Sequence, residues 1–182
     1  SDTATPKHFT YIFTPGGTGG LNSSSSGVWS KLLIAKAAFT DTGTADWSAI
    51  VRIEIEAETT GACTMYFDDW KLEEKSAEKS IATMETTEAW VWSDDGSFNT
   101  NKDYKVQGNT SIYINCPAKK SYSASLVKAV DLSIFGESET SSDDDYICFY
   151  MKWNRFKTIQ KIEIWFDINN GDYGDSMFYE IT

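Results

Sequence analysis

The feature that most constrains this chain is a hydrophobic pattern that repeats every second residue. The sequence IEIWFDI at residues 162–168 places an aliphatic or aromatic side chain at every even position. The sequence VRIEIEAE at 51–58 alternates in the same way, with charged residues between the apolar ones. Shorter runs with this period lie at 9–14, 112–114 and 147–152. Because successive side chains of a strand point to opposite faces of a sheet, the pattern predicts strands with one buried and one solvated face.

Turn-forming sequences separate these runs. A glycine-rich stretch at 16–20 continues into four serines at 23–26 and predicts a long loop. The dipeptide DG at 95–96 and the sequence NNGD at 169–172 are typical of hairpin turns. Many short strands between such turns predict an all-β protein, an antiparallel β-sandwich of the jelly-roll kind.

The charge balance disfavours several classes of partner. The chain has 27 acidic and 16 basic residues and a net charge of −11. A nucleic-acid-binding protein needs clustered lysine and arginine to release counterions from phosphate, and the sequence has no such cluster. Insertion into a membrane is also disfavoured, because the longest apolar runs are far shorter than a bilayer span. An acidic surface suits divalent cations and neutral ligands such as sugars.

Catalysis has little support in the sequence, and we predict that the protein is not an enzyme. His8 is the only histidine, which disfavours a Ser-His-Asp or Cys-His site. Carboxylates are so numerous that a glycosidase-like pair has no predictive value. Cys63, Cys116 and Cys148 match no zinc motif, and their odd number fits no complete disulfide framework. They are predicted to be small buried thiols.

Short motifs over most of the chain resemble one group of modules. The first set comprises VWSKL at 28–32, DWS at 46–48 and YFDDWKL at 66–72, and the second comprises GNTSI at 108–112, VDL at 130–132 and DYI at 145–147. The first set resembles the C-terminal half, and the second the N-terminal half, of carbohydrate-binding-module-like jelly rolls. Such domains occur in tandem in phage fibre and tail proteins and in bacterial surface proteins.

The resemblance implies a division of the chain into residues 1–75, a linker at 76–87 and residues 88–182. The first segment would complete one jelly roll and the second would begin another, so that the chain spans one permuted unit of a tandem array. The similar aromatic sequences at 9–14 and 177–182 agree with this interpretation. The alternative is that the chain forms one sandwich.

Trp165 is the main candidate for ligand binding. If Ile164 and Phe166 point inward, Trp165 stands on the opposite, outer face of its strand. We predict that its ring stacks on the apolar face of a sugar while polar neighbours hydrogen-bond the hydroxyl groups. The polar candidates, on the same strand and on a second strand expected to share its outer face, are Lys161, Glu163, Asp167, Tyr150 and Lys152. The alternative is that Trp165 packs beneath a loop or against another subunit.

Asp68 and Asp69 are the metal candidates. The resemblance implies that an acidic pair near this position holds a structural Ca²⁺ ion together with backbone carbonyls, because calcium prefers hard oxygen ligands. The alternative is a hydrogen-bonded aspartate that fixes the end of the strand. The acidic run at 143–145 and the loop at 167–175 are interpreted as solvated loops.

The predicted function is that of a non-catalytic module in a virion fibre or tail, or in another extracellular or cell-surface protein. It would serve display and attachment by binding a glycan. We expect a homo-oligomer or tandem neighbour domains, because repetition of the module raises avidity. One alternative is a targeting module of a secreted glycan-degrading enzyme. Another is a purely architectural subunit that assembles through its strand edges.

Overall fold

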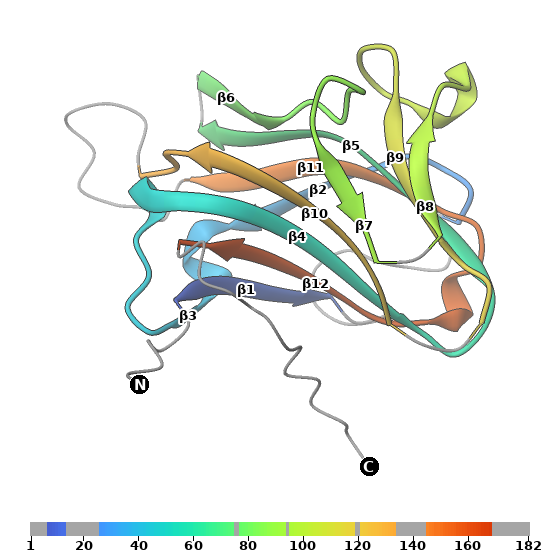
Figure 1. Cartoon of the computed structure of the whole chain (residues 1–182), viewed down its shortest axis with the longest axis horizontal. Coiled ribbons are helices and arrows are strands. Elements are labelled where there is room, and N and C mark those ends of the chain that lie inside the picture. The colour runs from blue at the N-terminus through green and yellow to red at the C-terminus, as the bar shows by residue number, and fades with distance from the viewer. Residues whose placement is uncertain are drawn as a thin grey trace.

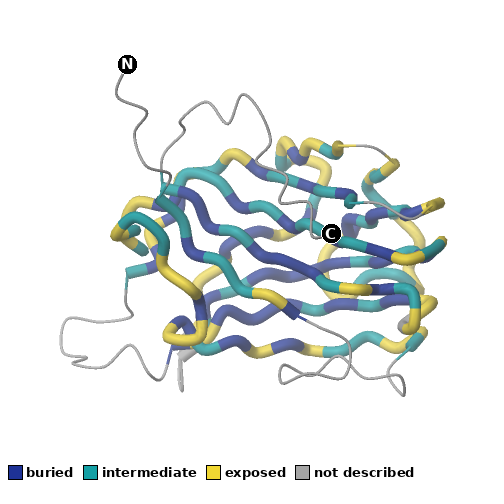
Figure 2. Tube along the Cα trace, turned by 90° about the horizontal axis from the view of Figure 1, so that it is seen from below, coloured by how far each residue is buried: buried dark blue, intermediate teal, exposed yellow. Residues whose placement is uncertain are grey.

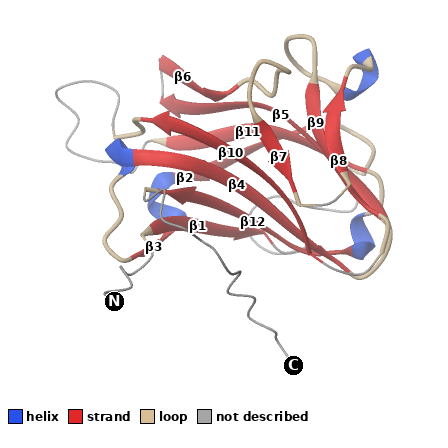
Figure 3. Ribbon diagram, in the orientation of Figure 1, coloured by secondary structure: helices blue, strands red, loops and turns tan. Residues whose placement is uncertain are grey.

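Two antiparallel sheets, each of six strands, face each other in this protein (Figure 1). A computed structural model describes residues 7–13, 26–74, 77–93, 95–118, 121–133 and 145–168. The predicted all-β sandwich is therefore confirmed. The helical elements of these residues are single turns at connections between strands (Figure 3), namely η2 (Lys36–Ala38), η3 (Trp47–Ala49), η4 (Lys102–Tyr104) and η6 (Phe156–Thr158).

The strand order shows how the chain alternates between the layers. Sheet A contains, from edge to edge, β3 (Thr40–Thr42), β1 (His8–Phe13), β12 (Ile159–Asp167), β4 (Ile50–Thr59), β10 (Ser121–Val130) and β7 (Trp90–Trp92). Sheet B contains β2 (Ser30–Ala35), β11 (Tyr146–Trp153), β5 (Cys63–Glu74), β9 (Ser111–Cys116) and β8 (Gly96–Asn99), and β6 (Ala77–Ala82) pairs with β5. In Figure 1, β12 lies between β1 and β4.

The core lies between the sheets and follows the period-two pattern. Buried positions alternate with more exposed ones along the strands (Figure 2). Trp70 of sheet B stacks on Phe149 with ring centroids 4.6 Å apart, and its ring centroid lies 6.2 Å from that of Phe166 of sheet A. Large aromatic side chains bury much apolar area, so contacts of this kind dominate the stability of such a core.

The two predicted segments share this core. In sheet A, β4 pairs with β10 and β12, and in sheet B, β5 pairs with β9 and β11. One buried cluster contains side chains from both sides of residues 76–87. In the described residues, segments 1–75 and 88–182 are therefore not separate bodies. Their correspondence to two halves of the resembled jelly rolls stays a prediction.

The expected linker at 76–87 needs a correction. Residues 77–82 form strand β6, which pairs with residues 70–74 of β5. Residues 77–82 can pair here because β9 is short. It pairs only with residues 63–67 of β5 and leaves the remaining part of this edge of β5 open. Unpaired backbone groups in a sheet are costly, and β6 supplies their partners.

Candidate functional site

The outward side chains of sheet A form the candidate site, and the pairing registers align them in rows across the sheet. We define the tryptophan row as Thr40, Thr10, Trp165, Glu54, Ser125 and Val91, from the β3 edge to the β7 edge. The glutamate row next to it contains Ile12, Glu163, Glu56 and Ser123. Directly opposed residues on neighbouring strands lie close enough for their side chains to interact.

Trp165 occupies the position predicted for it. Ile164 and Phe166 are fully buried in the core, whereas Trp165 is half-buried on the outer face with Thr10 and Glu54 as cross-strand neighbours. Its ring packs against the imidazole of His8 at a centroid distance of 4.6 Å and an interplanar angle of 46°. The contact with His8 fixes one side of the indole.

Glu163 is the most shielded carboxylate of the glutamate row. Its side chain forms an ion pair with Lys161, with 2.9 Å between Lys161 Nζ and Glu163 Oε2. The residue is only 8 % exposed. It stands directly opposite Glu56 of β4. Like charges in this position destabilise a sheet, which makes the pair a candidate for a role other than stability.

The surroundings of the pair shift the pKa of Glu56. Burial raises the pKa of Glu56 and the charge of Glu163 raises it further, against a hydrogen bond with Ser121. Burial lowers the pKa of Lys161, but the hydrogen bond with Glu163 and the negative charges of Glu163, Glu56 and Glu58 together outweigh burial, so the pKa is raised. Glu163 is thus held beside a firmly protonated lysine.

On the other side of Trp165 from the glutamate row, a histidine, an aspartate and an arginine stand opposite one another on β1, β12 and β4. Asp167 is buried on the outer face and stands opposite His8 of β1 and Arg52 of β4. Arg52 Nη2 lies 2.5 Å from Glu54 Oε2. Burial lowers the pKa of His8, although Asp167 and Asp41 oppose the shift, so the imidazole is neutral at pH 7.

Tyr150 and Lys152 do not belong to this site, which corrects the expectation that they share a face with Trp165. They lie on β11, which belongs to sheet B, so their outward side chains are on the opposite side of the sandwich. Lys152 donates from Nζ to the carbonyl of Asp103 at 3.1 Å and lies 4.1 Å from the ring centroid of Tyr104. The chain changes sheets between β11 and β12, which period-two alternation cannot reveal.

Asp68 and Asp69 lie at a bulge of β5. The pairing of β5 with β11 shifts by one residue there, and Asp69 has a φ of 51°. Asp68 is fully buried, and its Oδ2 accepts hydrogen bonds from the backbone N–H groups of Val106 at 2.6 Å and Gln107 at 3.0 Å. Asp69 forms an ion pair with Lys71 at 3.1 Å. Asp68 is thus a hydrogen-bonded aspartate, but it lies within β5 and ties the loop at 106–107 to the strand.

These contacts fit a calcium ion poorly. Calcium takes six to eight oxygen ligands, whereas one Asp68 oxygen already accepts two N–H groups and Asp69 is neutralised by a lysine. Asp68 Oδ1 is buried without a hydrogen-bond partner, yet no group of three or more acidic, histidine or cysteine side chains that could hold a metal occurs in the described residues. We derive no function from a metal at this position.

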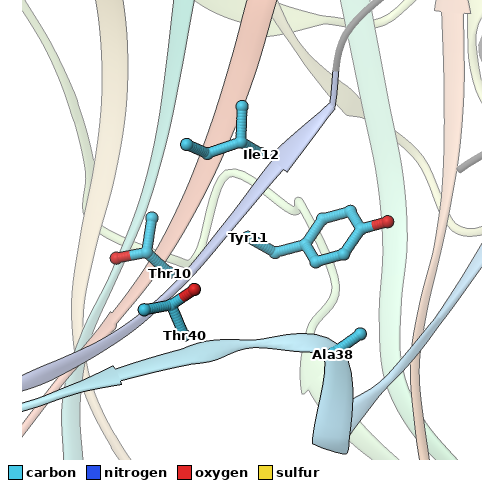
Figure 4. A pocket seen from close by; sticks show the side chains of 5 residues that line it. All are labelled: Thr10, Tyr11, Ile12, Ala38 and Thr40. Atoms are coloured by element: carbon cyan, nitrogen blue, oxygen red, sulfur yellow. The ribbon is translucent and has the colours of Figure 1, made fainter. Parts of the chain in front are cut away.

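A hollow of about 380 Å³ opens where the tryptophan row reaches the sheet edge (Figure 4). It is lined by Thr10, Tyr11, Ile12, Ala38 and Thr40. Thr10 and Ile12 point to one side of β1 and Tyr11 to the other. The pairing of β1 with β3 stops at Thr10 and Thr40, so the edge of β1 beyond this point lines the hollow.

Sequence reasoning missed the partners of Trp165 on neighbouring strands. His8, Arg52, Glu54 and Glu56 reach the site because β1 and β4 flank β12. The alternation at 51–58 did mark a solvated face on β4, which was the available signal. The order of strands in the sheet was not contained in that signal.

Comparison with known proteins gives no family assignment: no family model and no curated protein matches the sequence. Among the described residues, no helix has the length and apolar character to cross a membrane.

Proposed function

We propose that this chain is a non-catalytic glycan-binding module that binds its ligand on the outer face of sheet A. The observation that carries the proposal is the tryptophan row, in which a half-buried indole is flanked by hydroxyl groups on one side and by a carboxylate on the other. The ring of Trp165 offers an apolar surface for the C–H face of a pyranose. Thr10, Thr40, Glu54 and Ser125 offer hydrogen-bond partners for its hydroxyl groups.

The charges of the face define the class of glycan. The outward positions of β4 and β12 carry five carboxylates, from Glu54, Glu56, Glu58, Glu163 and Asp167, and these outnumber the two cations Arg52 and Lys161. An anionic sugar would meet like charges that are partly shielded from solvent. The ligand is therefore a neutral glycan or one that carries amino groups, and uronic or sialic acids are disfavoured.

The weakness of single sites of this kind favours a repeated module. One stacked ring with a few hydrogen bonds gives low affinity, and repetition of the module along a fibre or cell surface raises the avidity. We place the module in a virion fibre or tail, or in another extracellular surface protein, where it serves attachment.

The test is affinity electrophoresis of the purified chain through gels that contain neutral polysaccharides, namely a β-glucan, a mannan and a galactan. Trp165→Ala should weaken binding at least about tenfold, because it removes the stacking surface. Tyr150→Ala is the matched control, since it removes an outward aromatic from the opposite sheet, and it should bind as the parent does. Equal retardation of Trp165→Ala and the parent, or no retardation of the parent by any of these glycans or by a chitosan gel, would contradict the proposal.

A second candidate function is assembly through the β7 edge of sheet A. Val91 and Val127 are 63 % and 61 % exposed on the outer face, and Val91 is the cross-strand partner of Ser125, two residues from Val127. Exposed apolar side chains at a sheet edge suit contact with another subunit. Light scattering of the parent and of Val91→Lys tests it: an oligomer that the substitution dissociates supports assembly, and a monomeric parent contradicts it.

A further inference from the structure

Two of the three cysteines face each other across neighbouring strands. Cys63 is the first residue of β5 and Cys116 the last residue of β9, and the two are register partners. Both belong to the buried core, with exposed fractions of 3 % and 0 %. Cys148 is different, because it lies on β11 opposite Leu33 and Lys71 and outside the core cluster.

The geometry of this rung suits a covalent bond. Directly opposed residues of an antiparallel pair have Cα atoms roughly 4.5–5.5 Å apart, whichever kind of rung they occupy. Disulfides join Cα atoms separated by roughly 4.4–6.8 Å. Both cysteines are free thiols in this structure, and the interaction between their side chains is the largest cause of the pKa shift of each. Closing the bond therefore requires rotation of two side chains and no displacement of a strand.

The two thiols also differ in acidity. The hydrogen bond with Cys116 lowers the pKa of Cys63 despite burial, and the charge of Arg155 lowers it further. The same contact raises the pKa of Cys116. The rung lies at the end of the ladder, next to the exposed residues Ala62 and Pro117, so that opening of this end admits a small reagent.

We propose that Cys63 and Cys116 form a redox-active pair that closes into a cross-strand disulfide on exposure to a low-molecular-weight disulfide. The Cys63 thiolate attacks one sulfur of that reagent, the reagent's S–S bond breaks, and one small thiolate leaves. Cys116 then loses its proton to solvent and attacks Sγ of Cys63, and the second small thiolate leaves. Two protein thiols are oxidised by two electrons, and the reagent is reduced to two thiols.

The bond would join two strands of sheet B and enclose a segment that contributes to both sheets. The segment from Cys63 to Cys116 contains β5, β6, β8 and β9 of sheet B and β7 of sheet A. Closing a long segment restricts the unfolded chain and stabilises the folded one. The module would thus be more stable in oxidising surroundings, where disulfides persist. This inference is independent of glycan binding.

The experiment uses the purified full chain, reduced and then incubated with oxidised glutathione, and measures intact mass under non-denaturing and denaturing conditions. A loss of about 2 Da, with Cys63 and Cys116 joined in the non-reducing peptide map, is expected. The melting temperature should rise by roughly 5–10 °C relative to the reduced protein. Reduction with dithiothreitol should reverse both changes.

Cys148→Ala is the matched control, because it removes the third thiol and keeps the pair, and it should lose the same mass. Cys116→Ser should instead stop at an adduct of one glutathione on Cys63. If Cys116→Ser does not fold, the peptide map of the parent still shows whether Cys63 and Cys116 are joined. An unchanged parent mass, adducts without a joined pair, or a disulfide that includes Cys148 would overturn the proposal.

Discussion

The outer faces of the two sheets have similar alternating sequences but different surroundings. On sheet B, the chain around η4 lies over the strands: Tyr104 packs on Tyr66 with ring centroids 4.6 Å apart, and Asp103 accepts a hydrogen bond from Lys152. On sheet A, Trp165 has contacts with side chains of its own sheet, such as His8. An outward aromatic residue is thus a support for a loop on one face and an available surface on the other.

The comparison teaches that polarity and position on a strand do not by themselves define a binding face. Asp68 and Glu163 are both buried acidic residues on outer faces. Asp68 holds two backbone N–H groups of a covering loop, whereas Glu163 pairs with Lys161 beside a second glutamate. The partner of each carboxylate distinguishes structural support from a candidate site.

The largest expected effect concerns the charge of Asp68. Burial raises its pKa to about 6, helped by the neighbouring Asp69 and opposed by the N–H groups of Val106 and Gln107. The folded state therefore binds a proton more tightly than the unfolded state, and the free energy of unfolding should fall as the pH rises from about 4 to about 6. A shift of about 2 pKa units corresponds to about 3 kcal/mol.

Chemical denaturation at a series of pH values, applied to the parent and to Asp68→Asn, measures this effect. The amide cannot ionise, so the difference between the two stability curves should grow through this pH window in favour of Asp68→Asn and stay constant above pH 7. If the stability curves of the parent and the variant stay parallel from pH 4 to pH 8, the pKa of Asp68 is not raised by folding.

The next effect isolates the hydrogen bonds of Asp68 from its charge. Asp68→Ala should be less stable than Asp68→Asn by about 2 kcal/mol at every pH, because only the alanine leaves the N–H groups of Val106 and Gln107 without an acceptor. Hydrogen exchange of these two amides should be faster in the alanine variant. Equal stability of both variants would mean that the loop does not depend on this carboxylate.

A smaller effect is expected for the aromatic part of the cover on sheet B. Tyr104→Ala removes a ring that contacts Tyr66 and lies 4.1 Å from Lys152 Nζ, and should cost about 1 kcal/mol of unfolding free energy. Glycan binding on sheet A should stay unchanged in the same variant. A loss of binding would show that the two outer faces are not independent.

The smallest effect on stability is expected for the candidate site. Glu163→Gln removes the ion pair with Lys161 and also the repulsion with Glu56, so the free energy of unfolding should change by no more than about 0.5 kcal/mol. The pKa of Glu56 should fall, because the charge of Glu163 helps to raise it. NMR titration of the Glu56 carboxyl carbon measures this, and an unchanged pKa would mean that burial alone shifts it.

The sequence predicted what depends on local alternation. It identified strands at 51–58, 147–152 and 162–168, and it placed Ile164 and Phe166 inward and Trp165 outward, as the structure shows. It could not predict which strands are neighbours, because that order is set by packing between distant segments. For this reason the sequence does not show that Tyr150 lies on the other sheet from Trp165, or that Glu56 stands opposite Glu163.

Two local features also escaped the sequence. The bulge at Asp69 requires a positive φ at a residue other than glycine or asparagine, so no usual turn signal marks it. Strand β6 lacks clear alternation, because Glu78, Lys79 and Ser80 are all exposed and the segment is held by the free edge of β5. In both cases the surrounding sheet determines the local conformation.

The position of β12 between β1 and β4 has a consequence for synthesis of the protein. Of the described strands, the ribosome makes β1 first, and it makes β12, the strand that joins β1 to β4, last. Until residues 159–167 have left the exit tunnel, the backbone edge of β1 toward the centre of its sheet has no pairing partner. Pairing across so many residues is slow. The nascent chain must therefore wait with exposed strand edges, and protection by a chaperone during translation would be most valuable in that interval.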